Sequence, residues 1–148
     1  MKITELIEVK PITEVNAEDV NKFNPATGNV LPLLFEVRHA LARWLKSGEQ
    51  SVIDLRRIPL MPNEEELIEQ ALGEGEVTTQ LIALGKSLIN ETGIAGVWML
   101  THYNNDDQIV GKTIEVTDIP SILKSQPADM RQGLKHLDDY LSREATLQ

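Results

Sequence analysis

Leu72-Gly73-Glu74-Gly75-Glu76-Val77 and Glu91-Thr92-Gly93-Ile94-Ala95-Gly96-Val97-Trp98 are the two segments that organise this sequence, because both place carboxylates at glycine-rich corners. Gly73 directly follows an apolar stripe with helical spacing, and a glycine at that point supplies the left-handed residue that ends many helices. Gly75 offers a second turn position. The first corner is therefore predicted to end a helix and lead into a strand, and the second leads into a strand predicted over Val97–Tyr103.

The helix before the first corner has a marked beginning. Asn63 is a typical cap residue, and Glu66 follows three residues later, as in a capping box. Branched and aromatic residues predict four strands, which are Ser51–Ile58, Glu76–Leu84, Val97–Tyr103 and Ile109–Thr117. A polar turn at residues 104–107 joins the last two, so they are expected to form an antiparallel hairpin.

Two further helices flank these strands. One is predicted from about Leu31 to Leu45, with Gly48 in the position of a terminating glycine. The other opens near Pro127 and carries an apolar seam opposite a charged face: Met130, Leu134, Leu137 and Leu141. The pattern predicts an α+β fold, with an antiparallel sheet of about four strands and helices packed on one face. Prolines and asparagines predict a loosely ordered lead-in over residues 1–29, before a single domain over residues 30–148.

The charge balance excludes some classes of partner. The chain has 148 residues, of which 14 are basic and 23 acidic, for a formal net charge of −9. Nucleic acid is not expected as a partner, because the phosphate backbone would be repelled, and the same holds for an anionic membrane surface. No apolar run approaches the roughly 20 residues that cross a bilayer. The first residues mix acids with apolar residues, unlike a secretory signal, so we expect a cytoplasmic protein.

Metal and catalytic chemistry have little support in the sequence. Cysteine is absent, which excludes disulfides, thiolate nucleophiles and thiolate-bound zinc or iron–sulfur clusters within this chain. His39, His102 and His136 lie far apart and form none of the spacings typical of a metal site. We therefore expect no metal and no cofactor, and we favour a protein that is not an enzyme. The alternative is a small-molecule-binding or hydrolytic enzyme that uses Glu76 and Glu91 as acid and base.

The acidic corners admit several interpretations. A phosphate-binding loop is disfavoured, because the glycines follow a helix and lack the P-loop lysine. Glu76 is then either a docking contact for a basic partner or the ion-pair partner of Arg56 or Arg57. Trp98 is either a packing residue of the core or, if it is exposed, an anchor for a partner.

These corners also carry a resemblance to a known family. Together with Thr113-Ile114-Glu115-Val116 and Ile119-Pro120, they resemble the C-terminal domain of HupH/HyaF-type hydrogenase expression proteins, over residues 61–123. The family signatures correspond to Gly73–Val77, Glu91–Thr92, Gly96–Trp98, Ile114–Glu115 and Ile119–Pro120.

The resemblance implies an accessory role in the maturation of an uptake nickel–iron hydrogenase. It implies an assembly chaperone that binds the iron–sulfur-carrying small subunit or another maturation protein. The candidate partner-binding residues are Glu74, Glu76, Glu91 and Trp98, and the candidate structural residues are Gly73, Gly75, Gly93, Gly96 and Pro120. Larger members of the family carry two copies of the domain, and one is present here, so a homodimer would restore a two-copy arrangement.

Overall fold

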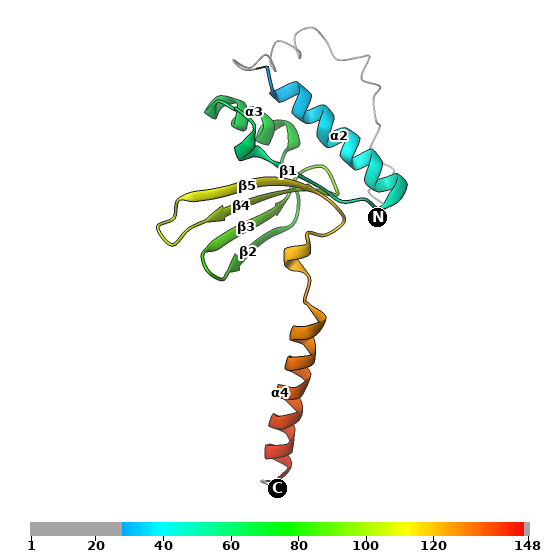
Figure 1. The fold of residues 1–148 in the computed structure, drawn as a ribbon, viewed down its shortest axis with the longest axis vertical. Helices are drawn as coiled ribbons and strands as arrows, with labels where there is room; N and C mark the ends of the chain where they lie inside the picture. Colours follow the sequence, from blue (N-terminus) through cyan, green and yellow to red (C-terminus); the bar gives the residue numbers. More distant parts are fainter. Residues whose placement is uncertain (1–27, 147–148) are drawn as a thin grey trace.

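The computed structural model describes residues 28–146, so most of the predicted lead-in over residues 1–29 lies outside the described part of the chain. Within residues 28–146, three helices and five strands form an α+β fold, the fold class that the sequence predicts (Figure 1). The elements, with two short 3₁₀ turns, are α2 (Val30–Ser47), β1 (Ser51–Asp54), η3 (Leu55–Arg57), α3 (Pro62–Leu72), β2 (Thr78–Ile82), β3 (Lys86–Glu91), β4 (Val97–Tyr103), β5 (Ile109–Val116), η4 (Ser121–Leu123) and α4 (Pro127–Thr146).

The sheet has five antiparallel strands in the order β1-β5-β4-β3-β2, one more than the sequence predicted. The missed strand is β3, which pairs with β2 across a tight turn at residues 83–85. The predicted strand Glu76–Leu84 is shorter than expected, because the chain reverses there. Gly85 makes the turn possible, since it adopts a φ of 146° and a Cβ in its place would lie 2.3 Å from the carbonyl oxygen of Tyr103.

The first strand also ends earlier than predicted. The Asp54 side chain accepts a hydrogen bond from the Arg56 backbone N–H (3.0 Å), and this bond begins the 3₁₀ turn η3. The second half of the predicted strand Ser51–Ile58 is therefore a turn. The β4–β5 hairpin has the predicted pairing, with a register irregularity at His102 and Tyr103.

The helix ends follow local capping chemistry. Gly48 ends α2 in the left-handed conformation (φ 73°), as predicted, and its N–H donates to the Trp44 carbonyl. The predicted start of α3 at Asn63 is wrong: Met61 is the cap residue, and its N–H donates to the Glu64 carboxylate (3.0 Å). Pro62 explains the earlier start, because its fixed φ suits the first position of a helix.

The main core lies between α2, α3 and three strands of the sheet. Its buried residues are Val30, Leu33, Val37, Ala40, Ile53, Leu55, Ile68, Leu72, Val97, Ile114 and Val116. Among the described residues, β2 and β3 contribute nothing to this cluster, so the two helices cover only the β1-β5-β4 half of the face. A smaller cluster on the opposite face contains Ile89, Trp98 and Leu100.

The last helix differs from the prediction that helices pack on the sheet. α4 projects away from the sheet (Figure 1), and none of its residues is buried. The apolar seam predicted within it is present in the sequence but covers nothing in the described part of the chain. Within residues 28–146, no helix is long and apolar enough to cross a membrane.

Candidate functional site

The two glycine-rich corners lie against each other and are joined by backbone hydrogen bonds. The Gly75 N–H donates to the Glu91 carbonyl (2.9 Å), and the Glu91 N–H donates to the Val77 carbonyl (2.9 Å). A third bond joins the second corner to the end of α3: the Gly93 N–H donates to the Leu72 carbonyl (2.9 Å). These bonds continue the β2–β3 ladder into the end of α3, so the two corners form one structural unit.

Glycine is required here because the two backbones approach closely. A Cβ on Gly75 would lie 2.4 Å from the carbonyl oxygen of Thr92, and a Cβ on Gly93 would lie 3.0 Å from that of Leu72. Gly73 instead allows the chain to turn out of α3, because it ends that helix with a φ of 71°. The glycines of the first corner therefore have a structural reason that is independent of any ligand.

Two other predicted structural residues lie nearby at the end of the sheet. Gly96 has a φ of 83° in the turn before β4, and its carbonyl accepts from the Thr117 N–H (2.9 Å). Thr92 fixes the same turn from inside: its hydroxyl donates to the Val97 carbonyl (2.8 Å) and accepts from the Ile94 N–H (3.2 Å). Pro120 is fully buried at the start of η4.

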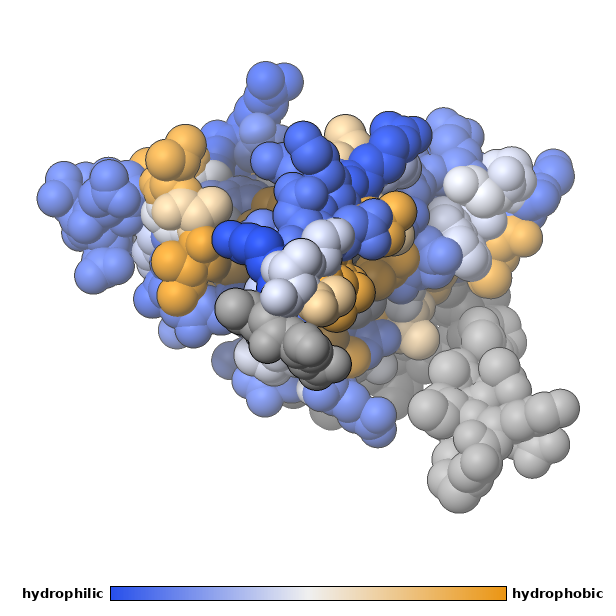
Figure 2. All heavy atoms as spheres, turned by 90° about the horizontal axis from the view of Figure 1, so that it is seen from below, coloured by the Kyte–Doolittle hydropathy of each residue, from blue (hydrophilic) through white to orange (hydrophobic). Residues whose placement is uncertain are grey.

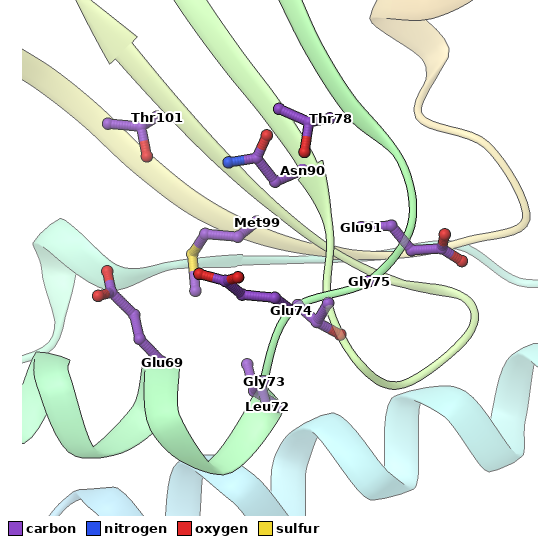
Figure 3. Close-up of a pocket in the computed structure, with 11 residues that line it drawn as sticks. Glu69, Leu72, Gly73, Glu74, Gly75, Thr78, Asn90, Glu91, Met99 and Thr101 are labelled. Carbon is purple, nitrogen blue, oxygen red and sulfur yellow. The ribbon is translucent and has the colours of Figure 1, made fainter.

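An open cavity of about 430 Å³ lies beside this unit (Figure 3). Its floor is formed by residues of β2, β3 and β4, at the margin of the part of the sheet that α2 and α3 cover, and its wall is the end of α3 with the first corner. The lining residues are Glu69, Leu72, Gly73, Glu74, Gly75, Thr78, Asn90, Glu91, Thr92, Met99 and Thr101. We call this space the corner cavity.

Asn90 is the least satisfied polar side chain in the corner cavity. Its Oδ1 atom is buried and has no hydrogen-bond donor among residues 28–146. Asn90 lies opposite Thr78 on one side and Met99 on the other in the sheet, in the floor of the cavity. A buried carbonyl oxygen without a donor costs about 1–3 kcal/mol, so its retention in the floor calls for an explanation.

The charges around the corner cavity are unequal. The Glu69 carboxylate pairs with the ammonium group of Lys112, which also lies 3.9 Å from a Glu65 carboxylate oxygen. Glu74 forms no ion pair within the described residues, and its carboxylate points toward the middle of the cavity (Figure 3). Among the described residues, the cavity is therefore lined by the Glu74 carboxylate, which has no ion-pair partner there, and by Asn90, whose buried amide oxygen has no donor there. Groups of this kind accept hydrogen bonds from ammonium, guanidinium or amide N–H groups.

The other predicted partner-binding residues lie elsewhere. Glu91 lines the cavity, but its carboxylate points away from Glu74 and Asn90 (Figure 3). Glu76 is exposed and outside the lining, and the described ion pair of Arg57 is with Asp54. Of these three glutamates, Glu74 therefore directs its carboxylate into the cavity. Glu91 lines the cavity without directing its carboxylate into it, and Glu76 lies outside the lining.

Trp98 needs a correction as a partner-binding residue. Its side chain is 5% exposed, and the indole N–H donates to the Thr117 carbonyl (3.1 Å). It packs with Ile89 and Leu100 on the face of the sheet opposite the main core. Of the two interpretations of Trp98, the structure therefore supports the packing residue, because the large ring buries well and its single donor is satisfied.

The arrangement gives no support to acid–base catalysis by Glu76 and Glu91. His102 follows Trp98 and Leu100 at two-residue intervals along β4 and so shares their face, away from the corner cavity, and its Nδ1 lies 2.7 Å from the Ser87 hydroxyl. Glu115 lies opposite Trp98 in the sheet, and burial raises the pKa of its carboxyl, while the charge of His102 opposes that rise. The described residues contain no group of three or more side chains suited to hold a metal ion.

Sequence reasoning missed the floor of the corner cavity. Thr78, Asn90, Met99 and Thr101 come from three different strands, and no local motif links them. A signal did exist at Asn90, since an amide is an unusual residue within a strand. That signal had no meaning while β3 itself was not predicted.

Comparison with known proteins agrees with the resemblance seen in the motifs. Residues 27–143 match the family described as "HupH hydrogenase expression protein, C-terminal conserved region". The chain is 32% identical over 111 residues to hydrogenase expression/formation protein HupH of Rhizobium leguminosarum bv. viciae, covering 75% of this chain and 39% of that protein. It is 25% identical over 123 residues to HoxQ of Cupriavidus necator, covering 83% of this chain and 44% of that protein. The chain thus spans less than half the length of these relatives.

A solved structure extends the similarity to the fold. Hydrogenase expression protein HupH from Thiobacillus denitrificans superposes with a TM-score of 0.76 and 37% sequence identity, over 78% of this chain and 97% of that one. The family match over residues 27–143 includes α2, α3, the sheet, both corners and most of α4. The chain therefore belongs to the HupH family of hydrogenase expression proteins, within its C-terminal conserved region.

Proposed function

We propose that this protein is an accessory assembly chaperone for an uptake nickel–iron hydrogenase, working in the cytoplasm by binding and without catalysis. Its client is the small subunit of the hydrogenase or another maturation protein. The proposal is supported by the family, whose relatives are named hydrogenase expression/formation proteins. A chain without cysteine cannot ligate a cluster through thiolates, but it can hold a client while clusters are inserted.

The observation that carries a binding role is the corner cavity. Its lining, in an open space of about 430 Å³, includes the Glu74 carboxylate and the Asn90 amide oxygen, and within residues 28–146 the first has no ion-pair partner and the second no hydrogen-bond donor. That volume lies within the usual range of about 300–1,000 Å³ for ligand pockets, so it suits one long side chain or a chain terminus. We infer that the cavity receives a cationic or N–H-donating group of the client.

Asn90 supplies the sharper test, because binding and stability should respond in opposite directions. Asn90→Leu replaces the amide with an apolar group of similar shape. It removes the unsatisfied oxygen, so the free energy of unfolding should rise by about 1 kcal/mol. The affinity for the purified small subunit, measured by biolayer interferometry, should fall about tenfold, since the client then loses a hydrogen-bond acceptor. Unchanged affinity together with higher stability would remove the cavity from the proposal.

Glu74 and Glu76 form a matched pair, because both are exposed glutamates of the same corner and only Glu74 lines the cavity. Glu74→Gln should weaken client binding about tenfold, the usual worth of one charge-assisted hydrogen bond. Glu76→Gln should change it less than about twofold, as expected for a charge outside the contact. Equal losses for the two variants would indicate general charge attraction. If the unmodified protein binds neither the small subunit nor a maturation protein, the chaperone function itself is wrong.

A further inference from the structure

α4 is an amphipathic helix that the rest of the described chain leaves uncovered. It runs for 20 residues, and none of them is buried. The side chains of its apolar seam are exposed by 61% at Met130, 61% at Leu134, 53% at Leu137 and 54% at Leu141. Figure 2 looks along the molecule from the C-terminal end of this helix, where hydrophobic and hydrophilic residues lie side by side at the surface.

A helix in this state is expected to have a partner. Isolated helices of this length are marginal in water, and most helical stability in proteins comes from packing of an apolar face. The spacing of the seam is four, three and four residues, which is the spacing of a two-helix coiled coil and gives a narrow stripe suited to one other helix.

We propose that α4 pairs with α4 of a second copy of this chain, and that the two helices run antiparallel. Aligned about its centre, the seam is complementary to itself. Leu134 lies level with the partner's Leu137, and Met130 lies level with the partner's Leu141, so every seam position meets an apolar one.

The charges beside the seam select this direction. Arg131 and Asp138 flank the seam on the same side of the helix. In the antiparallel alignment Arg131 lies opposite the partner's Asp138, and symmetry forms this ion pair twice. A parallel alignment places Asp138 opposite the partner's Gly133 instead, so neither ion pair forms.

Two further positions agree with the antiparallel direction. On the other flank of the seam, the small Gly133 lies opposite the partner's large Tyr140. Glu144 lies three residues beyond the last seam residue, Leu141, and the antiparallel alignment brings it to the first turn of the partner's α4, where the helix dipole favours a negative charge. A parallel pair would place the two Glu144 carboxylates against each other.

Introduced cysteines test the direction, because the chain has no cysteine of its own. Proteins carrying Leu134→Cys or Leu137→Cys should each stay uncrosslinked under mild oxidation and form a disulfide-linked pair only when mixed. Crosslinking of the Leu137→Cys protein with itself would show a parallel pair and overturn the proposal. The same holds if the mixture fails to crosslink, or if the unmodified protein sediments as a monomer throughout the micromolar range.

Charge reversal tests the interface without touching the seam. Arg131→Asp and Asp138→Arg should each weaken self-association about tenfold or more, because two attractive pairs become repulsive. Mixing the two variants should restore a dimer of nearly unmodified affinity, since each pair then again joins opposite charges. A mixture that remains monomeric, while each variant keeps the melting temperature of the sheet domain, would contradict the proposal. The proposal would also be contradicted if a client of different sequence bound α4 while the protein alone remained monomeric.

Discussion

Gly75→Ala should destabilise the fold by disrupting the contact between the two corners. The added Cβ would lie 2.4 Å from the Thr92 carbonyl oxygen and 2.9 Å from that of Glu91, whereas real Cβ atoms essentially never come within 3.0 Å. Both opposing atoms are backbone, so the strands must separate by more than half an ångström. That movement stretches the hydrogen bond from the Gly75 N–H to the Glu91 carbonyl, now 2.9 Å, beyond useful length.

The cost of this substitution can be assembled from its parts. Loss of the hydrogen bond contributes about 1 kcal/mol, and overpacking against rigid backbone adds about 1–3 kcal/mol. The stiffer unfolded chain returns about 0.5–1 kcal/mol, so the net loss in the free energy of unfolding is roughly 1–3.5 kcal/mol. For a domain of this size, that loss lowers the melting temperature by roughly 3–15 °C.

Circular dichroism during thermal and urea unfolding would measure this effect. Gly111→Ala is the matched control, because it changes a glycine of the same sheet whose added Cβ has the His102 side chain as its nearest neighbour, at an ordinary 3.4 Å. The control should stay within about 0.5 kcal/mol of the unmodified protein. If the Gly75→Ala and Gly111→Ala variants have the same melting temperature, the backbone of the corners accommodates the added Cβ at little cost, and close packing is not the reason for glycine at position 75.

Three other outcomes follow from the structure. Trp98→Phe should lower the free energy of unfolding by about 1–3 kcal/mol, measured in urea, because the buried Thr117 carbonyl loses its donor; weaker client binding at unchanged stability would contradict the assignment of Trp98 to the core. Burial raises the pKa of Glu115 above 4.5, so the folded state binds this proton more tightly than the unfolded chain, and stability falls as the pH rises through the interval above 4.5. Glu115→Gln should therefore raise the melting temperature at neutral pH, and this gain should disappear below pH 4.5, whereas a gain that persists in acid would have another cause. Elemental analysis of the purified protein should find no stoichiometric zinc or iron, and a chelator should leave its melting temperature unchanged.

The elements with strong local signals were predictable from the sequence. The helix ended by Gly48, the hairpin of β4 and β5 and the helix opened by Pro127 all follow from spacing and punctuation that need no tertiary information. β3 was missed because Leu88 and Ile89 are adjacent and give no alternation. Its existence depends on pairing with strands on both sides.

The candidate site was only half predictable. The sequence singled out the glycines, which join the two corners into one structural unit, and Glu74, which lines the corner cavity. The residues of the cavity floor could not be predicted from the sequence, because Thr78, Asn90 and Thr101 meet only when three strands are in register. Trp98 shows the opposite limit, since burial of a ring beside glycines is decided by the packing of distant residues.

The uneven cover of the sheet by α2 and α3 has a consequence for local opening. Amide hydrogens of β4 and β5 lie under the main core and should exchange with solvent only through global unfolding. β2 is an edge strand without helix cover, so its amides should exchange through smaller and more frequent openings. The floor of the corner cavity thus spans the boundary between the most and the least protected strands. We therefore expect a large group to enter the cavity by displacing β2, while the rest of the domain stays folded.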